Sequence, residues 1–142
     1  MTALAPRTFP AVLDSLGAIR VWVREAAQAA GLGGRPAHRL ELAVDEIATN
    51  AIVHGHEEAN RTGELFLSGE YDPALLRLVL EDGAAPFDPL AHPVPDAAAL
   101  ERPLEERPVG GLGILLAVRN VDRFAYERRG GRNRNVFEVR LR

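Results

Sequence analysis

Three residues able to take part in acid–base or metal chemistry recur at intervals of four: Glu46, Asn50 and His54. On a helix, this spacing aligns their side chains along one stripe of the surface. The amide oxygen of Asn50 is a hard ligand of the kind that Mg²⁺ accepts, and a carboxylate one turn earlier can take a proton from a nucleophile. The same stripe is also typical of a solvated helix face with a histidine near its C-terminus.

Two further features could complete a binding site. Asp82 and Gly83 follow an apolar run and precede the stretch from Pro86 to Pro89. A carboxylate at a strand end can accept a hydrogen bond from an exocyclic amine such as that of adenine, although Asp-Gly is also a common turn. A glycine run then stands before an apolar helical pattern, where backbone amides can approach an anion at a helix N-terminus, unless the run is only a hinge. Its residues are Gly110, Gly111, Leu112 and Gly113.

Composition excludes several other kinds of site. All 17 basic residues are arginines, so the chain lacks the lysine that a P-loop or an ordinary eukaryotic protein kinase places on the phosphates of ATP. Cysteine is absent, which removes disulfides, thiolate metal sites and a cysteine nucleophile. A net charge of −3 gives no support for nucleic-acid binding, and no apolar run is long enough to span a membrane. We therefore expect a cytoplasmic protein.

Two amphipathic helices are predicted in the first part of the chain. From Phe9 to Gly31, apolar residues recur every three or four positions and the pattern ends at a glycine. Trp22 and Val21 widen the apolar stripe, which indicates either a surface for self-association into a homodimer or a core tryptophan. The second helix, which carries the polar stripe, is predicted from Pro36, a residue suited to a first helical turn, to a stop at Gly55.

Strands are predicted where the apolar period changes to two. Alternating runs from Gly63 to Glu70 and from Leu75 to Leu80 predict an antiparallel pair. Closing strands are predicted from Phe124 to Arg129 and from Val136 to Leu141, with a glycine hinge and a polar stretch at 130–135 between them.

A long proline-rich segment separates these two pairs of strands. The stretch from Pro89 to Val109 has no sustained period, and loops of this length inside a domain are commonly functional lids. A third helix is predicted from the glycine run onward, with Ile114 and Val118 on its apolar side. The order of elements predicts one α+β domain over residues 1–142, a two-layer sandwich whose mixed, mostly antiparallel sheet has helices on one face.

The three polar features, in this order, resemble the three motifs of the ATPase family shared by gyrase, the chaperone Hsp90, histidine kinases and the mismatch-repair protein MutL. These proteins bind ATP in a Bergerat-type fold without a P-loop. Within the family, the chain is most similar to the small anti-sigma-factor serine kinases of bacterial partner-switching systems. Glu46 to Asn50 with His54 resembles their first motif, Asp82 with Pro86 to Pro89 the second, and the glycine run the third.

The resemblance implies a role for each matching residue. Asn50 would coordinate Mg²⁺, Asp82 would bind the adenine amine, and Glu46 would be the general base. The backbone at Gly111 and Gly113 would approach the phosphates. Further contacts to the nucleotide are implied for His54, Ala84, Phe87, Gly110, Leu112 and Asn135.

Two positions depart from the family pattern. Ala84 stands where the family has a glycine, which indicates a more crowded adenine pocket. A threonine that helps to hold adenine is replaced by either Asn133 or Asn135, and Asn135 is counted with the site.

The resemblance implies a serine/threonine kinase that uses ATP and Mg²⁺ to phosphorylate a small antagonist protein and that also sequesters a sigma factor. A second interpretation is a nucleotide-dependent protein-binding module without phosphotransfer. A third, a domain taken from a larger histidine kinase, is opposed by the shortness of the chain before the second helix.

Overall fold

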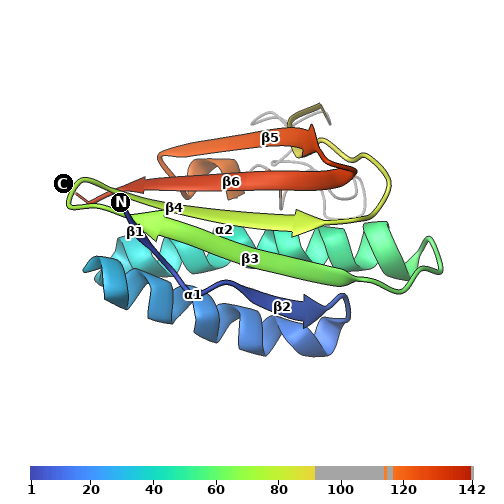
Figure 1. Cartoon of the computed structure of the whole chain (residues 1–142), viewed down its shortest axis with the longest axis horizontal. Helices are drawn as coiled ribbons and strands as arrows, with labels where there is room; N and C mark the ends of the chain where they lie inside the picture. The colour runs from blue at the N-terminus through green and yellow to red at the C-terminus, as the bar shows by residue number, and fades with distance from the viewer. Residues whose placement is uncertain (92–113, 115–116, 142) are drawn as a thin grey trace, which may run out of the picture.

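A six-stranded sheet forms one layer of the structure, with strand order β1-β3-β4-β6-β5 and β2 also paired with β3 (Figure 1). The computed structural model describes residues 1–91, 114 and 117–141. Every strand pair in this part of the chain is antiparallel. The strands are β1 (Thr2–Ala3), β2 (Arg7–Pro10), β3 (Glu64–Tyr71), β4 (Leu75–Asp82), β5 (Arg123–Arg129) and β6 (Arg132–Arg140).

Helices cover one face of this sheet (Figure 1). The long ones are α1 (Leu16–Ala30) and α2 (Gly34–Ile52), and Ile114 and residues 117–119 are also helical. Short helical turns are η1 (Leu13–Ser15), η2 (Val53–Glu57) and η3 (Pro89–Ala91). The predicted two-layer α+β architecture is confirmed. No helix in the described ranges is long and apolar enough to cross a membrane.

The core lies between the sheet and the helices. Alternate residues of the central strands, such as Leu76, Leu78 and Leu80 of β4, point toward the helices and are fully buried. They meet the apolar stripes of α1 and α2, which include Ile19 and Leu40. Burial of these side chains stabilises the layer arrangement by about 1.5–3 kcal/mol for each large aliphatic residue.

The first predicted helix begins later in the chain than its apolar period indicated. Phe9 lies in β2, where it pairs with Leu65 and is buried, and α1 starts only at Leu16. Val12, which the prediction placed on the apolar stripe, is exposed. The apolar spacing runs on by coincidence from strand to helix, and the two short N-terminal strands gave no alternation long enough to recognise.

The stretch 132–135, predicted as a polar segment between the closing strands, is the beginning of β6. The hinge consists of Gly130 and Gly131 alone, with φ of 60° and 77°, and joins β5 to β6 so that Arg129 pairs with Arg132. Two consecutive residues with positive φ form the tight hairpin turn for which glycine is favoured. The correction matters because it places Asn133 and Asn135 in a strand, with their side chains on the helix-covered face.

Trp22 belongs to the core. Its side chain is 7% exposed, and its indole N–H donates to the carbonyl of Ala5 at 3.2 Å. This bond ties the segment between β1 and β2 to α1. Val21 beside it is 43% exposed, so the apolar surface that remains on this part of α1 is small.

The opposite face of the sheet carries ion pairs in place of a second layer of helices. Glu138 is 6% exposed and accepts from Arg77 at 2.6 and 2.9 Å and from Arg123 at 3.1 Å. Burial by itself would raise the pKa of Glu138, but the hydrogen bonds from the two arginines outweigh it and lower the pKa below its ordinary value. Glu70 accepts from the same Arg77 at 2.9 Å, so these charges compensate one another across four strands.

Both ends of the described chain lie at the same end of the sheet (Figure 1). Thr2 pairs with Tyr71 just before the turn between β3 and β4, and the N–H of Leu141 donates to the carbonyl of Ala74 in that turn. α2 begins at this end of the molecule and runs toward the opposite one.

Candidate functional site

A cavity of about 140 Å³ lies where the C-terminal end of α2 meets the ends of β4 and β6. It brings together Asn50 of the first motif and Asp82 of the second, which are 32 residues apart in the sequence. The described residues that line it are Ile47, Asn50, Ala51, His54, Gly55, Ala59, Arg61, Asp82, Ala84, Ala85, Pro86, Phe87, Pro89, Asn133 and Asn135.

Asp82 is the last residue of β4 and is only 3% exposed. Its Oδ1 accepts from the N–H of Ala84 at 2.9 Å and from Nδ2 of Asn133 at 3.0 Å. No described residue donates to Oδ2, so one carboxylate oxygen is fixed by the chain and the other remains available to a ligand. This arrangement suits a carboxylate that binds an amine donor at the bottom of a cavity.

Asn133 holds the loop that follows β4. It pairs with Asp82 across the sheet, and its Nδ2 also donates to the carbonyl of Ala85 at 2.9 Å. Its Oδ1 accepts from the N–H of Phe87 at 3.0 Å and from the hydroxyl of Tyr126. Because both ends of the amide are bonded within the protein, Asn133 positions Asp82 and the loop from Ala84 to Phe87.

Asn135 differs from Asn133 in that its oxygen is buried without a hydrogen-bond partner among the described residues. On α2, Nδ2 of Asn50 is also buried without a hydrogen-bond partner among the described residues. Leaving a buried donor or acceptor unpaired costs about 1–3 kcal/mol, so two such atoms in one cavity wall fit a polar ligand that pairs with them. Of the two asparagines left open by the sequence, Asn135 is therefore the one free to contact a ligand.

The donor set at Asn50 also fits a metal ion. No described residue donates to its Oδ1, which leaves an amide oxygen beside the cavity, and amide oxygens are ligands that Mg²⁺ accepts.

Glu46 lies one turn before Asn50 on α2 and is half-buried. It is not among the described residues that line the cavity. Burial, together with the negative charge of the neighbouring Asp45, raises the pKa of Glu46 above its ordinary value. A carboxylate with a raised pKa is a stronger base than a solvated one, which is the property that proton abstraction requires.

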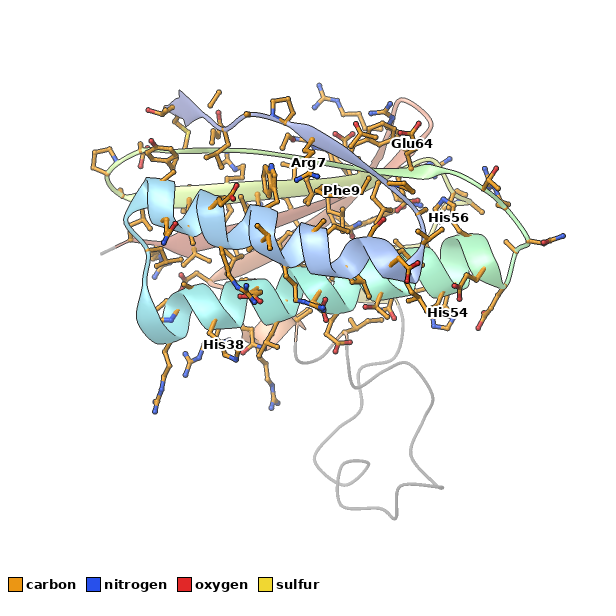
Figure 2. The ribbon with its side chains drawn as sticks, turned by 90° about the horizontal axis from the view of Figure 1, so that it is seen from below. Arg7, Phe9, His38, His54, His56 and Glu64 are labelled. Atoms are coloured by element: carbon orange, nitrogen blue, oxygen red, sulfur yellow. The ribbon has the colours of Figure 1, made fainter. Side chains whose placement is uncertain are left out.

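His54 and His56 lie in the turn η2 that follows α2 and point in different directions (Figure 2). The turn η2 that contains them is a π-helical turn, a feature often found at functional sites. His54 lines the cavity, and its Nδ1 lies 2.9 Å from the carboxylate of Glu58. His56 is 2% exposed, and its Nδ1 lies 2.8 Å from the carbonyl of Ala51. Only His54 therefore belongs to the cavity wall.

Ala84, the departure from the family glycine, is accommodated by Gly55. Ala84 is 2% exposed, and a Cβ added at Gly55 would lie 3.1 Å from its methyl carbon. The missing side chain at position 55 thus provides the space that the additional methyl group at position 84 occupies. The space for this methyl group is therefore left by η2, the turn after α2.

A double-mutant cycle tests whether Gly55 provides the space for the methyl group of Ala84. We expect Gly55→Ala to weaken nucleotide binding and to destabilise the fold by about 1–3 kcal/mol, because a second methyl group overpacks the contact. Ala84→Gly alone should cost about 1 kcal/mol through lost burial and added backbone freedom. The variant with both changes should recover most of the loss caused by Gly55→Ala, as measured by thermal unfolding and nucleotide titration. Additive losses in the double variant would show that the two positions are not coupled.

Several residues of this site were not predicted. Arg61 lines the cavity and donates to the carbonyl of Gly83 at 3.1 Å, and Arg128 donates to the carbonyl of Ala84 at 2.7 Å. Both fix the loop after β4, together with Tyr126 through Asn133. An exposed arginine in a loop or an edge strand has no sequence signal that indicates such a partner.

The third motif cannot be placed in the same way. Gly110, Gly111, Leu112 and Gly113 lie outside the described residues, as does most of the predicted lid from Pro89 to Val109.

The structure thus combines a helix-covered antiparallel sheet with a strand-end aspartate and a helix asparagine that line one cavity. The model of the histidine kinase-like ATPase domain matches residues 9–140. The chain therefore belongs to the histidine kinase-like ATPase family, whose domains bind ATP. No curated protein matches the sequence.

Proposed function

We propose that the protein is a serine/threonine kinase of the anti-sigma-factor type, which acts on partner proteins in the cytoplasm. Its phosphate donor would be ATP with Mg²⁺, its substrate a serine or threonine hydroxyl of a small antagonist protein, and its second partner a sigma factor. The observation that supports this most directly is Glu46, a half-buried carboxylate with a raised pKa one helical turn from Asn50.

Each residue has a defined role in this proposal. Asp82 and Asn135 bind the adenine of ATP. Asn50 offers its amide oxygen to Mg²⁺, which would neutralise charge on the phosphates. Glu46 accepts the proton of the substrate hydroxyl while the oxygen of that hydroxyl forms a bond to the terminal phosphorus. The bond from that phosphorus to the bridging oxygen breaks, and ADP leaves with the electron pair.

The variant Glu46→Gln tests the role of Glu46 as the general base. We expect phosphotransfer to fall about a hundredfold or more, because general-base catalysis contributes rate factors of this order. ATP affinity should change by less than about twofold, since Glu46 is not part of the cavity wall. The measurements are transfer of radiolabelled phosphate to a candidate antagonist and a nucleotide titration. Glu57→Gln, on the exposed turn after α2, is the matched control.

The same variant has an expected effect on stability. Because folding raises the pKa of Glu46, ionisation of this carboxyl opposes folding as the pH rises. Glu46→Gln should therefore raise the melting temperature by a few degrees at about pH 7, and the gain should disappear below about pH 4, where the carboxyl is protonated in both states. A variant that is inactive and less stable at pH 7 would indicate a structural role for Glu46.

A second candidate function is a nucleotide-dependent protein-binding module without phosphotransfer. It is favoured by the position of Glu46 outside the ring of described residues around the cavity. Under this hypothesis, binding of a partner depends on ATP and is unaffected by Glu46→Gln but lost in an Asp82 variant. A partner that is phosphorylated by the unaltered protein would exclude it.

A further inference from the structure

Four arginines differ from all the others in the described part of the chain because they have no partner there. Every other described arginine forms an ion pair or a hydrogen bond, or stacks on an aromatic ring. The guanidinium groups of the four exceptions form no ion pair, hydrogen bond or ring contact with any described residue. They are Arg35, Arg39, Arg119 and Arg140.

These unpaired arginines gather in one place. Arg39, Arg119 and Arg140 line a single hollow of about 390 Å³, and Arg35 lies one turn before Arg39 on α2. The hollow is formed by the beginning of α2, the residues before β5 and the end of β6. Figure 2 marks this end of α2 with His38 and the opposite end, at the cavity, with His54. The arginine hollow is thus separate from the nucleotide cavity.

Among the described residues of the hollow, one carboxylate, Asp122, stands against three guanidinium groups. It accepts from the backbone N–H of Arg140 at 2.7 Å and forms no ion pair with an arginine, so the hollow keeps an excess of positive charge. The first turn of α2 has no acidic residue, so the positive end of the helix adds to the same field. In a chain with a net charge of −3, this is a local reversal of sign, which favours an acidic partner.

The form of the hollow indicates what kind of acidic partner fits. Its walls include the apolar residues Pro36, Val121 and Val139 between the arginines. Guanidinium groups bind carboxylates with two parallel hydrogen bonds, and an apolar wall accepts a carbon side chain between them. A free phosphate or a lipid headgroup would use the charges but not the apolar wall. A peptide in which acidic and apolar residues alternate uses both.

We propose that this arginine hollow is a docking site for an acidic, apolar-containing segment of a partner protein. The site does not depend on the proposed kinase activity, and it would bind its partner at the end of the molecule opposite the nucleotide.

The test uses the full chain and a short fluorescent peptide of alternating glutamate and leucine. Fluorescence anisotropy should show binding that weakens with added salt, because exposed charges contribute to it. Arg39→Ala with Arg140→Ala should weaken binding by about tenfold or more, since two charge-assisted pairs are lost. A peptide with glutamine in place of glutamate should not bind.

Controls separate this site from general charge and from the nucleotide cavity. Arg7→Ala with Arg129→Ala removes the same charge from exposed positions elsewhere, and should leave peptide binding within about twofold. ATP affinity should be unchanged in both double variants. The proposal is wrong if the control weakens peptide binding equally, if no peptide binding occurs, or if inorganic phosphate displaces the peptide completely at millimolar concentration. Equal binding of the glutamine peptide, or arginine-dependent binding to vesicles of anionic lipid without peptide binding, would also overturn it.

Discussion

Asp82→Asn should reduce ATP affinity by about a hundredfold or more, which corresponds to about 2.7 kcal/mol. In the protein, Oδ1 of Asp82 accepts from Asn133 and from the N–H of Ala84, while Oδ2 remains for the ligand. An asparagine must place its NH₂ group on one of these two sides. The NH₂ group faces either the donors of the chain or the exocyclic amine of adenine. In both orientations two hydrogen-bond donors face each other and one hydrogen bond is lost.

Isothermal titration of the variant with ATP measures this effect. Asp88→Asn provides a matched control, because that carboxylate also accepts a backbone N–H, from Leu90 at 2.8 Å, yet does not line the cavity. The control should bind ATP within about twofold of the unaltered protein. If Asp82→Asn binds ATP as well as the control does, adenine is bound by other residues and the role assigned to Asp82 is wrong.

Asn133→Ala should have the largest effect on stability, about 2–4 kcal/mol, with a loss of ATP affinity of about tenfold. The substitution removes the donor to Asp82 and Ala85 together with the acceptor for Phe87 and Tyr126. Asp82 is buried and Phe87 and Tyr126 are half-buried, so the polar groups left by the substitution cannot all reach water unless the loop opens. The affinity falls because Asp82 is no longer held in place for the ligand.

Denaturant unfolding and nucleotide titration distinguish a positioning role from a purely structural one. If Asn133 positions Asp82, the affinity of the Asn133→Ala variant should fall for ATP even at temperatures where the variant is fully folded. Asn120→Ala, a half-buried asparagine far from the cavity, should leave ATP affinity unchanged. A folded Asn133→Ala variant with normal affinity would limit Asn133 to a structural role.

The fold could be predicted where one periodic signal extended over a whole element. The polar stripe on α2 and the alternation in β3 and β4 are long, so their types and their antiparallel pairing were predicted correctly. The N-terminal strands were missed because β1 has two residues and β2 has four, too few for a period to appear. Their pairing depends on the edge of β3, a tertiary contact that local sequence does not report.

The candidate site could be predicted only for residues whose chemistry is carried by the motif. Asp82 and Asn50 were predicted in this way, and the structure places both at one cavity. The division of roles between Asn133 and Asn135 could not be predicted, since it depends on which amide the loop after β4 bonds. The fit between Gly55 and Ala84 was equally hidden, because a contact between a helix end and a strand end has no fixed sequence spacing.

The shared location of the two chain ends determines where an attached protein would lie. Thr2 and Leu141 both reach the turn between β3 and β4, about 23 Å along β4 from Asp82. A fluorescent protein, an affinity tag or a natural neighbouring domain joined to either end would therefore be anchored beside Arg140 and away from the mouth of the nucleotide cavity. Fusions should leave ATP binding accessible to measurement, whereas peptide-docking experiments at the arginine hollow require the untagged chain.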